Sequence, residues 1–170
     1  MLGYITAEGR GAADRLLADL AAQLIAQGVD LAGVVQINRE THPDRLCDMD
    51  LQVLGHEFSM RISQNLGPHA RGCRLDPVGL ETAVGLVEAD LKRRPALLIL
   101  NKFGKSELEG RGFRNVIGQA LSEDVPVLTS VNKSNIEGFL RFADGMAEAL
   151  SPEPAQLMDW CIRRTEERFA

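Results

Sequence analysis

The chain has 170 residues, a formal net charge of −5, and the 45% hydrophobic and 25% charged residues of an ordinary soluble globular protein. Its length predicts one domain with its own core, and its acidic balance argues against a nucleic-acid or anionic-membrane surface. Three widely spaced cysteines, no apolar run of about 18 residues and no basic, apolar leader after Met1 predict a cytoplasmic protein without disulfides.

The first predicted strand, residues 2–6, leads through a short loop into an apolar helix, residues 12–27. This is where a phosphate-binding loop of the pattern G-x-x-x-x-G-K-[ST] belongs. On that pattern the two glycine positions are Ala7 and Ala12, the lysine position is Ala13, and the Ser/Thr position is Asp14. The strand–loop–helix arrangement is therefore expected, whereas most side chains that hold phosphates and Mg²⁺ are absent.

A continuous apolar run, residues 31–37, predicts a buried parallel strand. After a polar stretch, residues 48–63 alternate in two short runs around Gly55, which predicts an antiparallel β-hairpin inserted into the α/β chain. Asp76 and Pro77 predict the start of the next helix, because aspartate caps helices and proline suits the first helical position.

The rest of the chain continues this alternation of strands and helices. The predicted elements are a strand at 96–100, a helix at 111–123, a strand at 125–131, a helix from the Ser134–Glu137 capping box to about Leu150, and a final helix after the break at 151–154. The pattern predicts a three-layer α/β fold with a mainly parallel sheet, comprising residues 1–150 and a C-terminal helix, 151–170, packed on the same domain.

Ligands of such sheets bind at the carboxyl ends of the strands. The corresponding segments are residues 7–14, 38–47, 101–110 and 132–134. They carry the basic residues Arg10, Arg39, Arg45, Lys102, Lys105 and Lys133, with Arg111 just beyond them. With the free N–H groups of the first helix, these cations predict an anion site; the alternative is an ordinary polar surface neutralised by nearby carboxylates. The residues expected to form the anion site are Gly9, Arg10, Gly11, Ala12, Ala13, Asp14, Asn101, Lys102 and Lys105.

The segment Leu97–Glu107 stands where a strand-end aspartate would hold Mg²⁺ and a following glutamate would orient water. Here those positions are Asn101 and Lys102, so we expect Mg²⁺ to be poorly held and hydrolysis to be inefficient. If the protein is an enzyme, Lys105 and Glu107 are the expected catalytic residues. Lys105 is predicted to point toward the first helix, and Glu107 to pair with Lys105 or Arg10.

The order of elements resembles the small P-loop nucleoside-triphosphatases of the cancer-related and thermophile type. In that family the later strand ends in Asp-Glu-x-Gly-Lys-x-Glu; here Gly104, Lys105 and Glu107 match, and Asn101 and Lys102 depart from it. The segments Cys47–Met49, Ile62–Gly67, Gly72–Asp76 and Asn101–Lys105 also resemble an uncharacterised bacterial family. That resemblance implies a loose association with molybdate uptake and molybdenum enzymes.

Three functions remain open at this level. The first is a degenerate, accessory P-loop protein that binds a nucleotide or small oxyanion; the second is an atypical nucleoside triphosphatase or phosphotransferase. The third is a protein-interaction scaffold without a ligand. The expected partner is a small anion, with no nucleic acid and no membrane, and a homodimer is left open. The spacing of Cys47, Cys73 and the histidines predicts no metal site.

Overall fold

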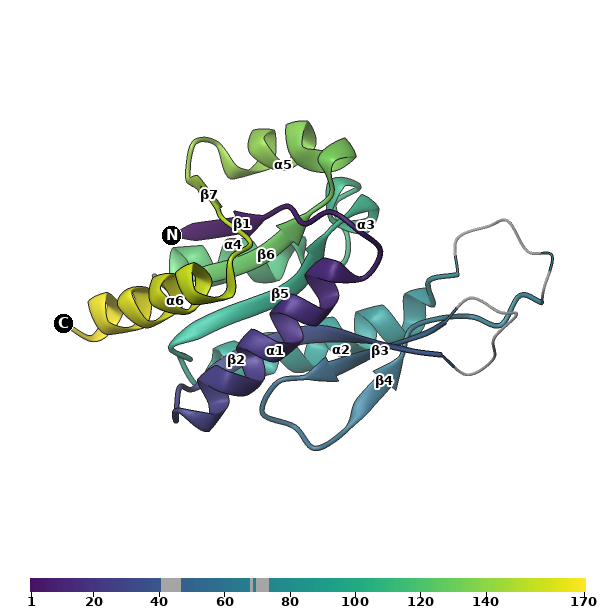
Figure 1. Cartoon of the computed structure of the whole chain (residues 1–170), viewed down its shortest axis with the longest axis horizontal. Coiled ribbons are helices and arrows are strands. Elements are labelled where there is room, and N and C mark those ends of the chain that lie inside the picture. Colours follow the sequence, from purple (N-terminus) through teal and green to yellow (C-terminus); the bar gives the residue numbers. More distant parts are fainter. Residues whose placement is uncertain (41–46, 68, 70–73) are drawn as a thin grey trace.

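The computed structural model describes residues 1–40, 47–67, 69 and 74–170, which form one seven-stranded sheet covered by helices (Figure 1). The strand order across the sheet is β4-β3-β2-β5-β6-β1-β7. The strands are β1 (Leu2–Ile5), β2 (Leu31–Arg39), β3 (Asp48–Val53), β4 (Ser59–Arg61), β5 (Leu97–Phe103), β6 (Val127–Val131) and β7 (Ala147–Leu150). β2, β5, β6, β1 and β7 are mutually parallel, whereas β3 and β4 add an antiparallel hairpin beside β2. The predicted hairpin is therefore confirmed.

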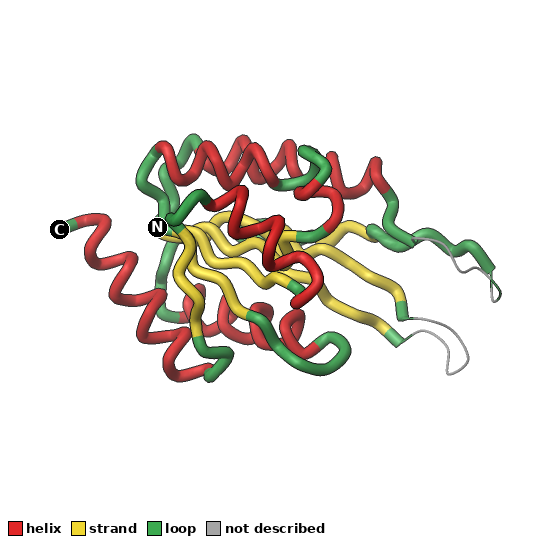
Figure 2. The backbone as a smooth tube through the Cα atoms, turned by 90° about the horizontal axis from the view of Figure 1, so that it is seen from above, coloured by secondary structure: helices red, strands yellow, loops and turns green. Residues whose placement is uncertain are grey.

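Helices cover both faces of the sheet, as the view along it shows (Figure 2). They are α1 (Ala12–Ala26), α2 (Pro77–Leu91), α3 (Lys105–Leu108), α4 (Arg114–Ser122), α5 (Ile136–Ala143) and α6 (Pro154–Phe169), with a 3₁₀ turn at Lys133–Asn135. Side chains of α1 and α6 share one core cluster, and those of α2, α4 and α5 share the other. The prediction of a three-layer α/β fold is confirmed.

The central strand β5 shows why a continuous apolar run was the right signal for a buried strand. Leu98 and Leu100 contribute to the core beneath α2 and α4, whereas Leu97 and Ile99 contribute to the core beneath α1 and α6. All four are fully buried. Because successive side chains point to opposite faces, a strand covered on both sides is apolar throughout.

The approach of β2 to β5 requires glycine at position 33. Gly33 pairs with Ile99 and has a φ of 119°, and a Cβ there would lie 1.8 Å from the Ile99 carbonyl oxygen. No side chain can be accommodated at that distance, so this residue fixes the contact between two central strands.

The helix predicted from residue 134 to about Leu150 is wrong. The chain forms a 3₁₀ turn, the short α5, and then a seventh strand, β7, parallel to β1. α5 stops because Asp144 and Gly145 adopt positive φ angles of 45° and 82°. Ser134 lies inside the 3₁₀ turn and α5 has no side-chain cap hydrogen bond, so the predicted capping box does not form.

Candidate functional site

The loop between β1 and α1 contains two glycines with left-handed backbone angles. Gly9 and Gly11 have φ angles of 95° and 69°, and Arg10 between them stays at negative φ. Glycine adopts these positive angles without strain. One of the N–H groups expected to bind the anion already has a partner, because the Ala12 N–H donates to the Gly9 carbonyl oxygen at 3.3 Å. The remainder of the loop is exposed or half-buried.

Asp14, in the first turn of α1, accepts hydrogen bonds from a group of amides. Its Oδ2 accepts from Asn38 Nδ2 at 2.7 Å and from Gln36 Nε2 at 3.4 Å, and its Oδ1 accepts from Asn101 Nδ2 at 2.9 Å. Asp14 is only 8% exposed and Asn101 only 4%. We call these four residues the amide cluster; it joins the start of α1 to the carboxyl ends of β2 and β5.

Asn101 forms hydrogen bonds through its side-chain oxygen, its side-chain nitrogen and its backbone carbonyl. Its Oδ1 accepts the backbone N–H of Gln36 at 3.0 Å, and its own carbonyl accepts the Ser130 hydroxyl at 2.5 Å. The residue therefore ties β2, β5 and β6 together with α1. A buried amide satisfied by both its donor and its acceptor has a fixed orientation, since reversing it would leave polar groups unpaired.

The amide cluster has a chemical consequence for Mg²⁺. Asp14 and Asn101, which the sequence pattern predicts at the Ser/Thr and metal-binding aspartate positions of a P-loop enzyme, bond to each other. The Asp14 carboxylate accepts three N–H groups, which leaves it little remaining capacity to coordinate a cation. The described residues also contain no group of three or more His, Cys, Asp or Glu side chains arranged to hold a metal.

Sequence reasoning missed Gln36 and Asn38. The signal was present, because the two polar residues alternate with apolar ones at the end of β2 and so share one face of the strand. What the pattern could not indicate is that this face meets Asp14.

The predicted pairing of Glu107 with Lys105 or Arg10 is wrong. Lys105 begins the short α3, its side chain is 85% exposed, and its Nζ lies 3.8 Å from Glu109 Oε1. Glu107 is only 5% exposed; its Oε2 accepts the Gly104 N–H at 2.9 Å and its Oε1 the Phe113 N–H at 3.1 Å. A carboxylate that satisfies two backbone donors stays buried at the turn, whereas lysine keeps its hydration. Glu107 therefore fixes the loop after β5 and does not face Lys105 or Arg10.

The predicted basic cluster is partly neutralised. Lys133 Nζ lies 2.5 Å from Glu8 Oε1, which joins the loop after β1 to the turn after β6. The hydrogen bond from Lys133, with its charge, lowers the pKa of Glu8. Arg111 pairs with Glu109. Arg10 and Lys102 are exposed at this end of the sheet. Arg45, another member of the predicted cluster, lies outside the described residues, as does Cys73.

Arg39 is the last residue of β2 and pairs with the hairpin. Its Nε lies 2.8 Å from Asp50 Oδ2, and Arg61 pairs with the other oxygen of the same carboxylate. Burial raises the pKa of Asp50, but the hydrogen bonds from Arg61 and Arg39 outweigh it and lower the pKa overall. Arg61 also reaches Asp48 at 2.9 Å. These ion pairs brace β2, β3 and β4 against one another.

The last helix contributes to the core. Leu157, Trp160 and Cys161 are buried against residues of α1 and the central strands. Burial raises the pKa of the Cys161 thiol to about 12, so it remains protonated and unreactive at neutral pH. No helix in the described part of the chain is long and apolar enough to cross a membrane.

The fold is similar to a solved structure. THEP1 from the hyperthermophile Aquifex aeolicus superposes with a TM-score of 0.64 over 91% of both chains, at 14% sequence identity. That similarity concerns the fold alone, and it agrees with the predicted three-layer α/β fold.

A curated relative is similar in sequence. The molybdenum import ATP-binding protein ModC 2 of Bradyrhizobium diazoefficiens is 34% identical over 151 residues, which are 86% of this chain. They are only 16% of that protein, so the chain spans a small part of its relative. A family model described as protein of unknown function, DUF2478, matches residues 2–160. The chain therefore belongs to the DUF2478 family.

Proposed function

We propose that the chain binds a phosphate group or a similar oxyanion at the loop of residues 7–14, and that it does so without efficient hydrolysis. The ligand is either a nucleotide or a free anion such as molybdate, and both present the same chemistry to the loop. The role is accessory to molybdenum metabolism in the cytoplasm. The proposal joins a retained P-loop-like fold to a site that lacks the groups of a Mg²⁺-dependent enzyme.

The observation that carries the proposal is the 2.9 Å hydrogen bond between Asp14 and Asn101. A hydrolytic P-loop site needs the side chains at these two positions for Mg²⁺, and here they are committed to each other. Ala13 supplies no charge where the lysine would stand. Binding at the loop itself needs neither group, because backbone N–H groups and the positive end of α1 attract anions on their own.

The molybdenum context rests on the curated relative. A stretch similar to almost this whole chain occurs within a much longer protein named for molybdenum import and ATP binding. We therefore propose that this domain works alongside such an import protein. Both the nucleotide and the transported oxyanion are candidate ligands in that setting.

The test is a thermal-unfolding panel on the full chain. The additives are ATP, ADP, GTP, inorganic phosphate, sulfate, molybdate and tungstate, each with and without Mg²⁺. A ligand at about 100 times its Kd stabilises the native state by roughly 2.7 kcal/mol. ATP and GTP turnover is measured in parallel, and we expect it to be negligible.

Gly9→Ala provides the site variant and Gly28→Ala its matched control. Both glycines have positive φ, 95° and 82°, and a Cβ at either meets no atom closer than 3.9 Å. Both substitutions therefore strain the backbone to a similar extent. Only Gly9→Ala should reduce the ligand-induced shift, since Gly28 lies at the far end of α1.

Three outcomes contradict the proposal. Absence of stabilisation by every additive would reject ligand binding and favour the scaffold function. An equal shift in Gly9→Ala and wild type would move the site away from this loop. Mg²⁺-dependent turnover on the order of 1 s⁻¹ or faster would favour an active nucleoside triphosphatase.

A further inference from the structure

The strand β7 forms an open edge of the sheet. It is the last strand in the order and pairs with β1 on one side. Its four residues are half-buried or exposed. Beside it, between β7 and α6, lies a groove of about 360 Å³. An unpaired edge presents backbone N–H and C=O groups to another strand, so this side of the molecule is suited to accept one.

Hydrogen bonds hold the side chains that line the groove between β7 and α6. Glu148 Oε2 accepts the Trp160 indole N–H at 3.0 Å and the Arg164 guanidinium at 3.1 Å. Glu148 and Leu150 therefore face α6, where Leu150 packs against the core cluster that contains Trp160. Ala147 faces the opposite layer. A partner strand would thus meet an ordered surface with a defined inner and outer face.

We propose that β7 pairs antiparallel with β7 of a second copy of this chain, with the two-fold axis at Ala149. The sheet would then continue across both molecules, with the two α6 helices on the same face. Directly opposed residues of an antiparallel pair point to the same face, so Glu148 lies opposite the second copy's Leu150. This register keeps the two Glu148 carboxylates from facing each other and places the small Ala149 on the axis.

The charges of the groove favour a second copy over an unrelated strand. Asp159 and Arg163 both line it, are both exposed, and stand one helical turn apart on α6. In an isologous interface the same surface of both copies is in contact, related by a two-fold axis. Asp159 of each copy therefore faces Arg163 of the other, which gives two ion pairs. The surface is thus complementary to its own rotated copy.

Apolar side chains extend the same surface at the start of β7. Met146 precedes β7 and Met1 precedes β1, and the parallel register of the two strands places them next to each other. They are 52% and 50% exposed. A four-residue strand is short for a stable interface, which buries at least about 1,200 Å² in total. The groove and the methionine pair supply the additional contact.

The experiment is sedimentation velocity on the full chain at concentrations from low to high micromolar. We expect a concentration-dependent species with twice the 18.6 kDa chain mass. Arg163→Glu and Asp159→Arg should each weaken dimerisation at least tenfold, because each places like charges across the interface twice. The double variant Asp159→Arg/Arg163→Glu restores both pairs and should recover the dimer. Ala149→Lys, which places two lysines at the axis, should abolish it.

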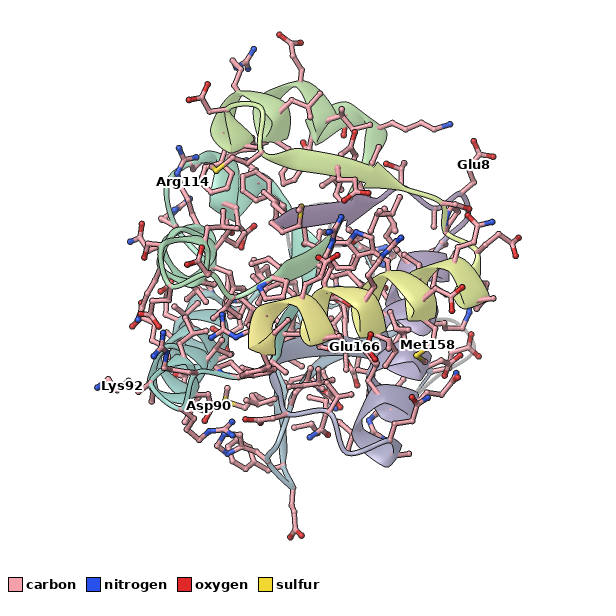
Figure 3. All side chains as sticks on the ribbon, turned by 90° about the vertical axis from the view of Figure 1, so that its left-hand side faces the viewer. Glu8, Asp90, Lys92, Arg114, Met158 and Glu166 are labelled. Atoms are coloured by element: carbon pink, nitrogen blue, oxygen red, sulfur yellow. The ribbon has the colours of Figure 1, made fainter. Side chains whose placement is uncertain are left out.

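Lys92→Glu is the control, since Lys92 ends α2 on the other face of the sheet, far from α6 and its labelled residues Met158 and Glu166 (Figure 3). It should leave dimerisation unchanged. Circular dichroism confirms that each variant is folded. A wild-type chain that remains at 18.6 kDa throughout overturns the proposal, and so does a dimer that none of the groove variants affects. A monomer whose β7 becomes protected from hydrogen exchange only on adding another protein would assign the edge to a different partner.

Discussion

Replacing Asn101 with aspartate tests the central claim about the site. The substitution keeps the shape of the side chain but converts the 2.9 Å N–H···O bond to Asp14 into a contact between two carboxylates. Two unit charges about 4 Å apart repel by roughly 4 kcal/mol at an effective dielectric constant near 20. Relaxation and proton uptake reduce this repulsion, so we expect Asn101→Asp to lower the free energy of unfolding by about 2–4 kcal/mol at pH 7.5.

The assay is urea denaturation at several pH values. The destabilisation should shrink as the pH falls, because a proton on either carboxyl group restores a donor between them. The exchanged variant Asp14→Asn/Asn101→Asp should recover most of the loss. In it the amide again donates to the carboxylate, and the Gln36 N–H still finds an acceptor at position 101.

Asn115→Asp is the control, because Asn115 is exposed on α4. It should change stability by less than about 0.5 kcal/mol. The reasoning is refuted if Asn101→Asp is as mild as this control, or if the exchanged variant is no more stable than Asn101→Asp alone. Either result would mean that the bond between positions 14 and 101 contributes little to the native state.

Three further predictions concern the scaffold around the site. Glu107→Gln should destabilise the protein by about 1–3 kcal/mol in chemical denaturation, because one of two buried N–H groups loses its acceptor, whereas Glu109→Gln should have little effect. Gly33→Ala should yield little folded protein by circular dichroism, since its Cβ would lie 1.8 Å from the Ile99 oxygen. Burial raises the pKa of Asp50, but the hydrogen bonds from its arginine partners lower it by more, so the pKa is lower in the folded than in the unfolded state. The Asp50 carboxylate therefore stabilises the fold at pH values above its unfolded pKa near 4. This stability should be lost as the pH falls below that value, and Asp50→Asn should melt with less dependence on pH in this range.

The agreement between sequence and structure is closest where burial alone decides the element. The first four residues of β5 and the first five of β2 carry no polar side chain, since both faces of the sheet are covered. α1 begins and ends within a residue of its predicted bounds, and α2 begins where Asp76 and Pro77 predict, because these signals are local features. The hairpin of β3 and β4 followed from alternation in the same way.

The site was predictable only in part. The position of the loop of residues 7–14 follows from the order of strand and helix. The partners of Asp14 do not, since Gln36 and Asn101 are 22 and 87 residues away along the chain. Glu107 was predicted to pair with Lys105 or Arg10, but the backbone donors that bury it are positioned only by the folded turn.

The sequence by itself determined the layer architecture and the location of the candidate loop, because periodicity and helix caps are local properties of the chain. Only the tertiary structure decided the secondary structure of residues 147–150. Ala147-Glu148-Ala149-Leu150 consists of strong helix formers and was predicted to be helical. It becomes β7 because the turn at Asp144 and Gly145 ends α5, and because β1 offers it an unpaired edge. Hydrogen bonding to a neighbour distant in sequence outweighed a propensity of only a few tenths of a kcal/mol per residue.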